Sequence, residues 1–229
     1  MNGTDNNLKV SFQIAVPSRT TSSEGSTGGS SDSPDTVIDT IDCPSVEYAI
    51  SLANGYISKK LNLSHCKVIV ISEQVAANGI SDIVYTLYNH PEVRPSSNVI
   101  ISRSTAYDFL ASSKSSLENI TAKYYEIVTT SSQTTGFTSD ITLSDVISGI
   151  SDTFGEASAI LGSVAGEDKA SSTNIYETDT IAGEDTSGSG QKTETSSNID
   201  VVGLSVFKGD VLVRRINCGR NNLSLNCYE

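Results

Sequence analysis

The stretch LSHCKVIVISEQVAANGI, residues 63–80, joins an apolar run to an acidic residue and then to a short helical pattern. Glu73 follows the run directly after Ser72, and Gly79 closes the helix. A carboxylate between a strand and a helix is placed where a general acid or base could act. The same position also favours an anion for a structural reason, because the N–H groups and the dipole of a helix start attract negative charge. Glu73 is interpreted as part of the scaffold unless a partner is spaced to work with it.

Few such partners exist. Nucleophilic catalysis needs a base beside the nucleophile, usually a histidine, and the chain has only His65 and His90. His65 precedes the apolar run, where it can cap backbone groups, and His90 lies at a helix end, where it complements the helix dipole. A glycosidase would need a second carboxylate with a raised pKa, and none stands out. The glycine tracts EGSTGGSS and TSGSGQK lack the phosphate-binding pattern. We predict no catalytic residues and no enzyme.

The four cysteines do not form a metal-binding pattern. They lack any C-x-x-C pair, and only two histidines could assist them. They are interpreted as small buried or free thiols, and no metal and no cofactor are predicted. A disulfide between the last two is left open. The four are Cys43, Cys66, Cys218 and Cys227.

Composition bounds the class of protein. The chain has 229 residues, 37% of them hydrophobic, which is enough for one domain with a core. Fifteen Lys and Arg against 27 Asp and Glu give a net charge of −12, which disfavours nucleic acid as a partner. No apolar run approaches the ~18 residues of a membrane span. The start, MNGTDNNLKVSF, has neither the basic nor the apolar region of an export signal.

Hydrophobic periodicity predicts the elements of an α+β domain. Alternation over residues 8–17 indicates a half-buried strand, and TVIDTID a second short one. Residues 67–71 are apolar on both faces and are therefore expected to form a central strand. SNVIISRS predicts another strand, with Ser104 as the cap of the next helix.

Further signals follow in the second half. Thr142 with Asp145 three residues later is typical of a capping box that opens a helix. VVGLSVFKGDVLVRRI predicts a hairpin, because alternating flanks enclose a tight turn. We expect a mixed β-sheet packed by several amphipathic helices, with a C-terminal β-hairpin. The helical patterns lie at residues 46–61, 73–77, 82–89, 106–110, 117–128 and 143–154.

An ordered set of residues resembles the N-terminal domain of the Ger(x)C family, the lipoprotein C subunits of spore germinant receptors. The pattern runs Leu-x-His, an apolar run, Glu-x-Ala-x-x-Gly, a helix, Glu-x-Arg, an apolar strand, and Ala-x-(Asp/Glu)-x-Leu. VSFQIAVPS and VVGLSVFKGDVLV resemble the family's first long strand and its hairpin. Ala76 stands beside the family's small residue before the glycine. The residues that fill the pattern are His65, Glu73, Gly79, Glu92, Arg94, Ala106, Asp108 and Leu110.

The resemblance implies a non-enzymatic subunit on the outer face of the spore inner membrane, with membrane-embedded A and B subunits as partners. It implies that His65, Glu73, Glu92 and Arg94 form the fold. The expected domain covers residues 8–215, with flexible loops at 18–34 and 166–197. A divergent tail is expected at 216–229.

One departure from the family concerns the lipid anchor. None of its cysteines follows an apolar signal segment, so the lipid anchor of intact family members is expected to be absent from this chain. The function expected is support for assembly or signalling of a membrane complex during spore germination. The alternative is an extracytoplasmic module that binds a small nutrient or germinant.

Overall fold

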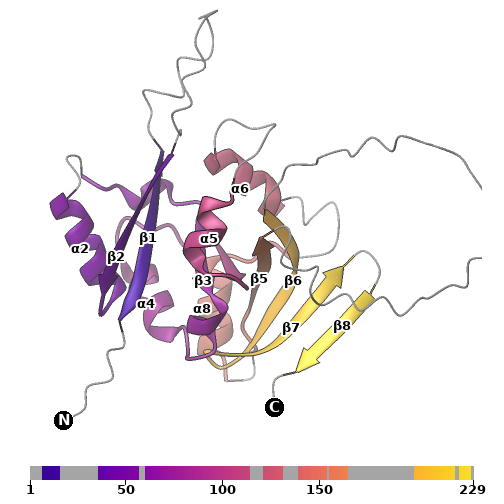
Figure 1. Ribbon diagram of the computed structural model, residues 1–229. Helices are drawn as coiled ribbons and strands as arrows, with labels where there is room; N and C mark the ends of the chain where they lie inside the picture. The colour runs from indigo at the N-terminus through magenta and orange to yellow at the C-terminus, as the bar shows by residue number, and fades with distance from the viewer. Residues whose placement is uncertain are drawn as a thin grey trace, which may run out of the picture.

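The computed structural model describes residues 7–15, 36–56, 60–113, 121–130, 139–153, 155–164, 199–219 and 222–227. The predicted loops at 18–34 and 166–197 lie outside these ranges, and so does the mobility expected of them. The described strands form two separate sheets, which Figure 1 shows side by side with helices around them.

The smaller sheet is an antiparallel pair with one helix on it. Its strands carry the predicted alternation, and Ala49 and Ala53 of the helix are fully buried against them. Ser45 starts the helix, because its hydroxyl accepts a hydrogen bond from the Tyr48 N–H at 3.3 Å. The three elements are β1 Leu8–Ala15, β2 Thr36–Cys43 and α2 Val46–Tyr56.

Polar contacts fasten β1 to the larger part of the molecule. The Gln13 amide donates to the Leu110 carbonyl at 3.3 Å, and the Tyr125 hydroxyl donates to the Gln13 side chain at 3.2 Å. Burial raises the pKa of Tyr125 to about 12, so this hydroxyl keeps its proton and remains a donor.

The larger sheet has six strands in the order β3-β4-β5-β6-β7-β8. The first three are parallel, and each later strand is antiparallel to its neighbour. A mixed sheet with several helices and an antiparallel C-terminal part confirms the predicted α+β class. The strands are β3 Val68–Ser72, β4 Asn98–Ser102, β5 Ser158–Val164, β6 Ile199–Lys208, β7 Val211–Gly219 and β8 Asn222–Cys227.

The prediction that residues 67–71 form a central strand is wrong. β3 lies at one end of the strand order, and β4, with β3 and β5 on either side, is the buried interior strand. Val68 and Val70 are apolar because they pack against the core from the edge, where α5 also contacts the strand. An edge strand covered on its faces has the same apolar pattern as a central one.

Among the described residues, five α-helices accompany the larger sheet. Thr142 and Asp145 form the predicted capping box, with the Thr142 N–H donating to the Asp145 carboxylate at 2.9 Å. The cap expected at Ser104 is instead Thr105, whose hydroxyl accepts from the Asp108 N–H at 3.1 Å. The helices are α3 Glu73–Ala76, α4 Ser81–Asn89, α5 Ala106–Ala111, α6 Thr121–Thr130 and α8 Leu143–Ser151.

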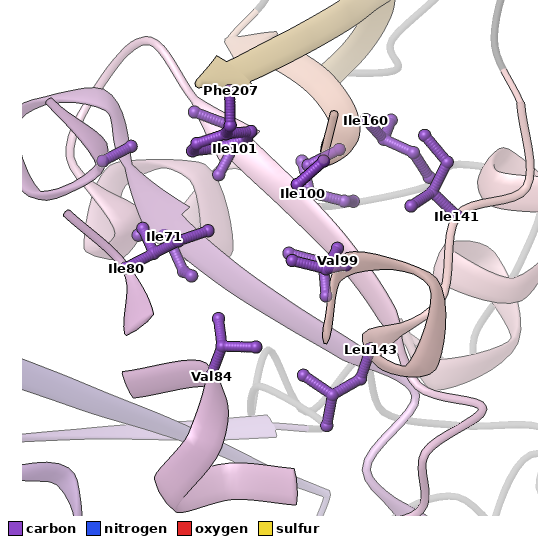
Figure 2. Close-up of a cluster of buried hydrophobic side chains, with 14 of the residues drawn as sticks. Ile71, Ile80, Val84, Val99, Ile100, Ile101, Ile141, Leu143, Ile160 and Phe207 are labelled. Carbon is purple, nitrogen blue, oxygen red and sulfur yellow. The ribbon is translucent and has the colours of Figure 1, made fainter. Parts of the chain in front are cut away.

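The main core lies between β4 and the helices around it. Figure 2 shows that side chains from β3, β4, β5, β6, α4 and α8 meet in one cluster. Phe207 of β6 belongs to the same cluster as Ile101 of β4 and is 1% exposed. Each such side chain contributes about 1.5–3 kcal/mol through burial. A strand from the end of the chain therefore completes a core begun by the first half.

The strands after residue 198 form the predicted hairpin and one further strand. β6 and β7 meet at a turn in which Gly209 has a φ of +64°, a conformation that suits glycine. β7 continues to Gly219, and β8 then pairs with it, so the segment expected as a tail adds to the sheet. The domain bounds 8–215 and 216–229 stay predictions.

Candidate functional site

Glu73 stands where the apolar run predicted it, at the first residue of α3 directly after β3. Its carboxylate accepts a hydrogen bond from the Arg215 guanidinium, with Nη1 and Oε2 3.0 Å apart. The two side chains are only 16% and 20% exposed. The carboxylate is thus engaged by a cation of β7 in a site with little access for solvent.

The turn after α3 touches the same hairpin at a second point. Gly79 has a φ of +105°, and the next N–H, that of Ile80, donates to the Asp210 carbonyl at 3.0 Å. A Cβ on Gly79 would lie 2.8 Å from the Asp210 carboxylate. We call these two contacts, Glu73–Arg215 and Gly79–Ile80 with Asp210, the hairpin clasp.

Glu92 makes local structural contacts. Its carboxylate accepts from the Lys60 ammonium at 2.8 Å and from the Leu63 N–H at 3.3 Å. The pKa of Glu92 lies below its ordinary value, first because of the hydrogen bond from Lys60 and then because of the Leu63 N–H. The same pair raises the pKa of Lys60. Glu92 therefore ties the segment before β3 to the loop before β4.

His65 and Arg94 lie together in a different place. His65 ends the short 3-10 helix η2, Leu63–His65, and Arg94 lies in the loop before β4. Both side chains are exposed and line a pocket of about 180 Å³. Lys67 and Glu126 lie in the same pocket and form an ion pair at 3.3 Å. We call this the amino-end pocket, because it lies where β3 and β4 begin.

His90 and the described cysteines show no catalytic arrangement. His90 caps the C-terminal end of α4, and its Nδ1 accepts from the Glu92 N–H at 3.3 Å. Cys43 and Cys66 are free thiols, and burial raises the pKa of both. Among the residues that the structure describes, no group of three His, Cys, Asp or Glu side chains could hold a metal ion.

The strand register bears on the other two cysteines. Cys218 lies opposite Leu223, and Cys227 lies opposite Arg214, four residues further along β7. The side chains of these two residues lie outside the part of the chain that the structure describes, so the disulfide between them stays open.

With this geometry in place, comparison with known proteins decides the family. A family described as "Spore germination protein N-terminal domain" matches residues 2–165, more than half of the chain. The chain belongs to this family. The resemblance drawn from the sequence is confirmed.

A curated relative of the spore germination family agrees. The Bacillus subtilis (strain 168) protein named "Putative spore germination protein YfkR" is 24% identical over 102 residues. That match covers 44% of this chain and 27% of the relative, so the chain spans about a quarter of the relative's length. No solved structure matches the chain.

Two contacts of this family member were not predicted. Arg215 lies 142 residues from Glu73, and no local pattern links them. Glu126 reaches the amino-end pocket from α6, whose periodicity showed only an amphipathic helix. The sequence signal for the pocket was the basic character of His65, Lys67 and Arg94, which are spread over thirty positions.

Proposed function

We propose that the protein is a non-enzymatic subunit of a spore germinant receptor that supports assembly or signalling of a membrane complex. The observation that carries this proposal is the match of residues 2–165 to the spore germination family. A role in spore germination follows from the family. The subunit role is more specific than a role in germination, and the geometry at Glu73 supports it.

Glu73 is the acidic residue best placed for chemistry, and its surroundings favour a structural role. A general base needs an accessible lone pair within reach of a substrate proton. Here one oxygen accepts from Arg215, and the side chain is 16% exposed. Neither His65 nor His90 takes part in the contact between Glu73 and Arg215. The β6–β7 hairpin covers this contact. The carboxylate holds the hairpin to α3.

The proposed partners are membrane-embedded A and B receptor subunits, at the outer face of the spore inner membrane. In intact family members a lipid anchor provides the attachment. Within the described residues, no helix is long and apolar enough to cross a membrane.

Fractionation of spores tests the subunit role. A tagged copy, expressed in the native sporulating cell, is expected in the inner-membrane fraction and to co-purify with multi-spanning proteins after crosslinking. Deletion of the gene is expected to slow germination, and the tagged copy to restore it. A protein that fractionates away from the membrane and crosslinks to no membrane protein would contradict the proposal.

A charge-neutralising variant tests the non-enzymatic role. Glu73→Gln is expected to reduce germination only as far as it reduces the abundance of the protein. Asp82→Asn, at an exposed position in the first turn of α4, is the control for loss of one carboxylate. A Glu73→Gln protein with normal abundance, an unchanged melting temperature and no germination would show that the carboxylate performs chemistry.

A further inference from the structure

The amino-end pocket combines a small volume with an uneven distribution of charge. It encloses about 180 Å³ between three segments that are distant in sequence. These are the η2–β3 connection, the loop before β4 and one face of α6. Water occupies about 30 Å³ per molecule in the liquid, so the pocket has room for a ligand of several heavy atoms.

Basic groups predominate in the pocket. Lys67, Arg94 and His65 line it, and Glu126 is its only carboxylate among the described residues. Glu126 is engaged with Lys67 at 3.3 Å. Lys67 and Arg94 each carry a positive charge, and Glu126 carries one negative charge. The pocket therefore has one excess positive charge, to which a protonated His65 imidazole would add. The pocket is therefore locally positive in a chain whose net charge is −12.

His65 and Arg94 are the two basic residues that indicate a binding site. In the described part of the chain neither side chain takes part in a hydrogen bond or an ion pair. Carboxylates outnumber basic side chains by 27 to 15, so counter-charges are plentiful. Nearby Lys60 finds Glu92 at 2.8 Å. Two basic side chains that line one pocket without a partner among the described residues have the chemistry of a site for an external anion.

Neutral donors add to this chemistry. The hydroxyls of Ser96 and Thr130 line the pocket and make no hydrogen bond within the described residues. The Asn98 amide is already engaged, since it donates to Asp140 at 2.5 Å. An oxyanion accepts several hydrogen bonds, and a guanidinium with hydroxyl groups supplies them in the directions that a planar or tetrahedral oxyanion requires.

We propose that the amino-end pocket binds a compact oxyanion, a carboxylate or phosphate group of a small molecule. Arg94 pairs with two of its oxygens, His65 donates to it from the η2 side, and Ser96 and Thr130 complete the set. Lys67, held by Glu126, adds a fixed charge at the wall. This inference goes beyond the receptor-subunit role, which would stand without it.

Titration of the full chain with two simple anions tests the site. Backbone amide spectra are recorded while sodium phosphate or sodium acetate replaces sodium chloride at constant ionic strength. We expect saturable shifts confined to residues 64–67, 94–98 and 126–130. Tighter binding of phosphate would identify a phosphate group as the ligand chemistry, and tighter binding of acetate a carboxylate.

Variants separate the site from general charge effects. Arg94→Gln is expected to weaken the binding of the preferred anion on the order of tenfold, because it removes a charge-assisted pair of hydrogen bonds. His65→Gln is expected to weaken it less. Lys208→Gln, which removes an exposed charge on the distant β6–β7 hairpin, is the control and should bind as the parent does.

The melting temperatures of all variants, without added anion, show whether the fold is intact. Shifts that never saturate, shifts spread over the whole surface, or equal losses in Arg94→Gln and Lys208→Gln would overturn the proposal. Saturable binding that Arg94→Gln leaves unchanged would overturn it as well.

Discussion

The hairpin clasp and the amino-end pocket lie at opposite ends of the parallel strand β3. At its carboxyl end, Glu73 is 16% exposed and engaged by Arg215. At its amino end, His65 and the neighbouring Arg94 are exposed and have no partner among the described side chains. The position that most resembled an active site is therefore occupied by a contact of the fold. The residues that were expected to form the fold are available for binding.

The difference between the two ends shows how charged residues should be interpreted in this protein. An acidic residue after a strand attracts attention because ligands commonly bind at the carboxyl ends of parallel strands. Here the chain itself fills that position with the β6–β7 hairpin. What distinguishes the two ends is whether a protein partner is present, and this depends on contacts between distant segments.

The largest effect is expected from Gly79→Ala in the clasp. A side chain at a φ of +105° is strained, and its Cβ would lie 2.8 Å from the Asp210 carboxylate. We expect a loss of about 3 kcal/mol in the free energy of unfolding. Gly55→Ala in α2, which meets no atom within 4 Å, is the control and should stabilise the protein by about 0.5–1 kcal/mol. Equal behaviour of the two variants in urea denaturation would contradict the clasp.

Arg215→Ala should come next. It leaves the half-enclosed Glu73 carboxylate without its cation, at a cost of about 2 kcal/mol after allowance for its partial exposure. Arg214→Ala removes the preceding, exposed arginine of β7 and should change stability by less than about 0.5 kcal/mol. A double-mutant cycle with Glu73→Gln measures the coupling directly. A coupling energy near zero would show that the pair does not hold the hairpin.

Glu92 gives a pH-dependent effect. Its pKa in the folded protein is lowered, so its contribution to stability is present above the unfolded pKa of about 4.3 and is lost as pH falls through the folded pKa. The parent should exceed Glu92→Gln in stability near neutral pH, and the difference should shrink below about pH 4. Denaturation midpoints measured from pH 7 to pH 3 test this. A difference that grows on acidification would have the wrong sign for the Lys60 pair.

The smallest effect on stability is expected in the amino-end pocket. Arg94→Gln and His65→Gln remove no contact of the described protein, so each should change the free energy of unfolding by less than about 0.5 kcal/mol. Thermal unfolding in chloride buffer measures this. A loss of 2 kcal/mol in either variant would mean that the side chain forms the fold after all, and the contrast between the two ends would disappear.

Local signals in the sequence predicted local structure well. The capping box of Thr142 and Asp145, the glycine stop at Gly79 and the β6–β7 hairpin all formed as expected, because neighbouring residues determine them. β5 was missed, since SAILGSV contains Gly162, and a glycine weakens a strand pattern. Glycine nevertheless suits this position, because a Cβ on residue 162 would lie 2.7 Å from the ring of Phe109.

Contacts between distant segments could not be predicted. The apolar character of residues 67–71 indicated burial correctly, but a strand's place in a sheet depends on which strands join it. For the candidate site, the sequence supplied Glu73, His65 and Arg94 and suggested that no catalytic partner accompanies Glu73. Folding brings Arg215 to Glu73, and it brings Glu126 to the pocket that His65 and Arg94 line.

The pairing of β5 with β6 has a consequence for how the molecule forms. The family match ends at residue 165, one residue after β5, whereas the strand that hydrogen-bonds to β5 begins at Ile199. During synthesis the edge of β5 must therefore stay unpaired until β6 has left the ribosome. Closing contacts across 142 residues is slow compared with forming a helix or a hairpin. The step that limits folding should be the docking of the C-terminal hairpin, and a nascent chain stalled before it is the species most exposed to aggregation and proteases.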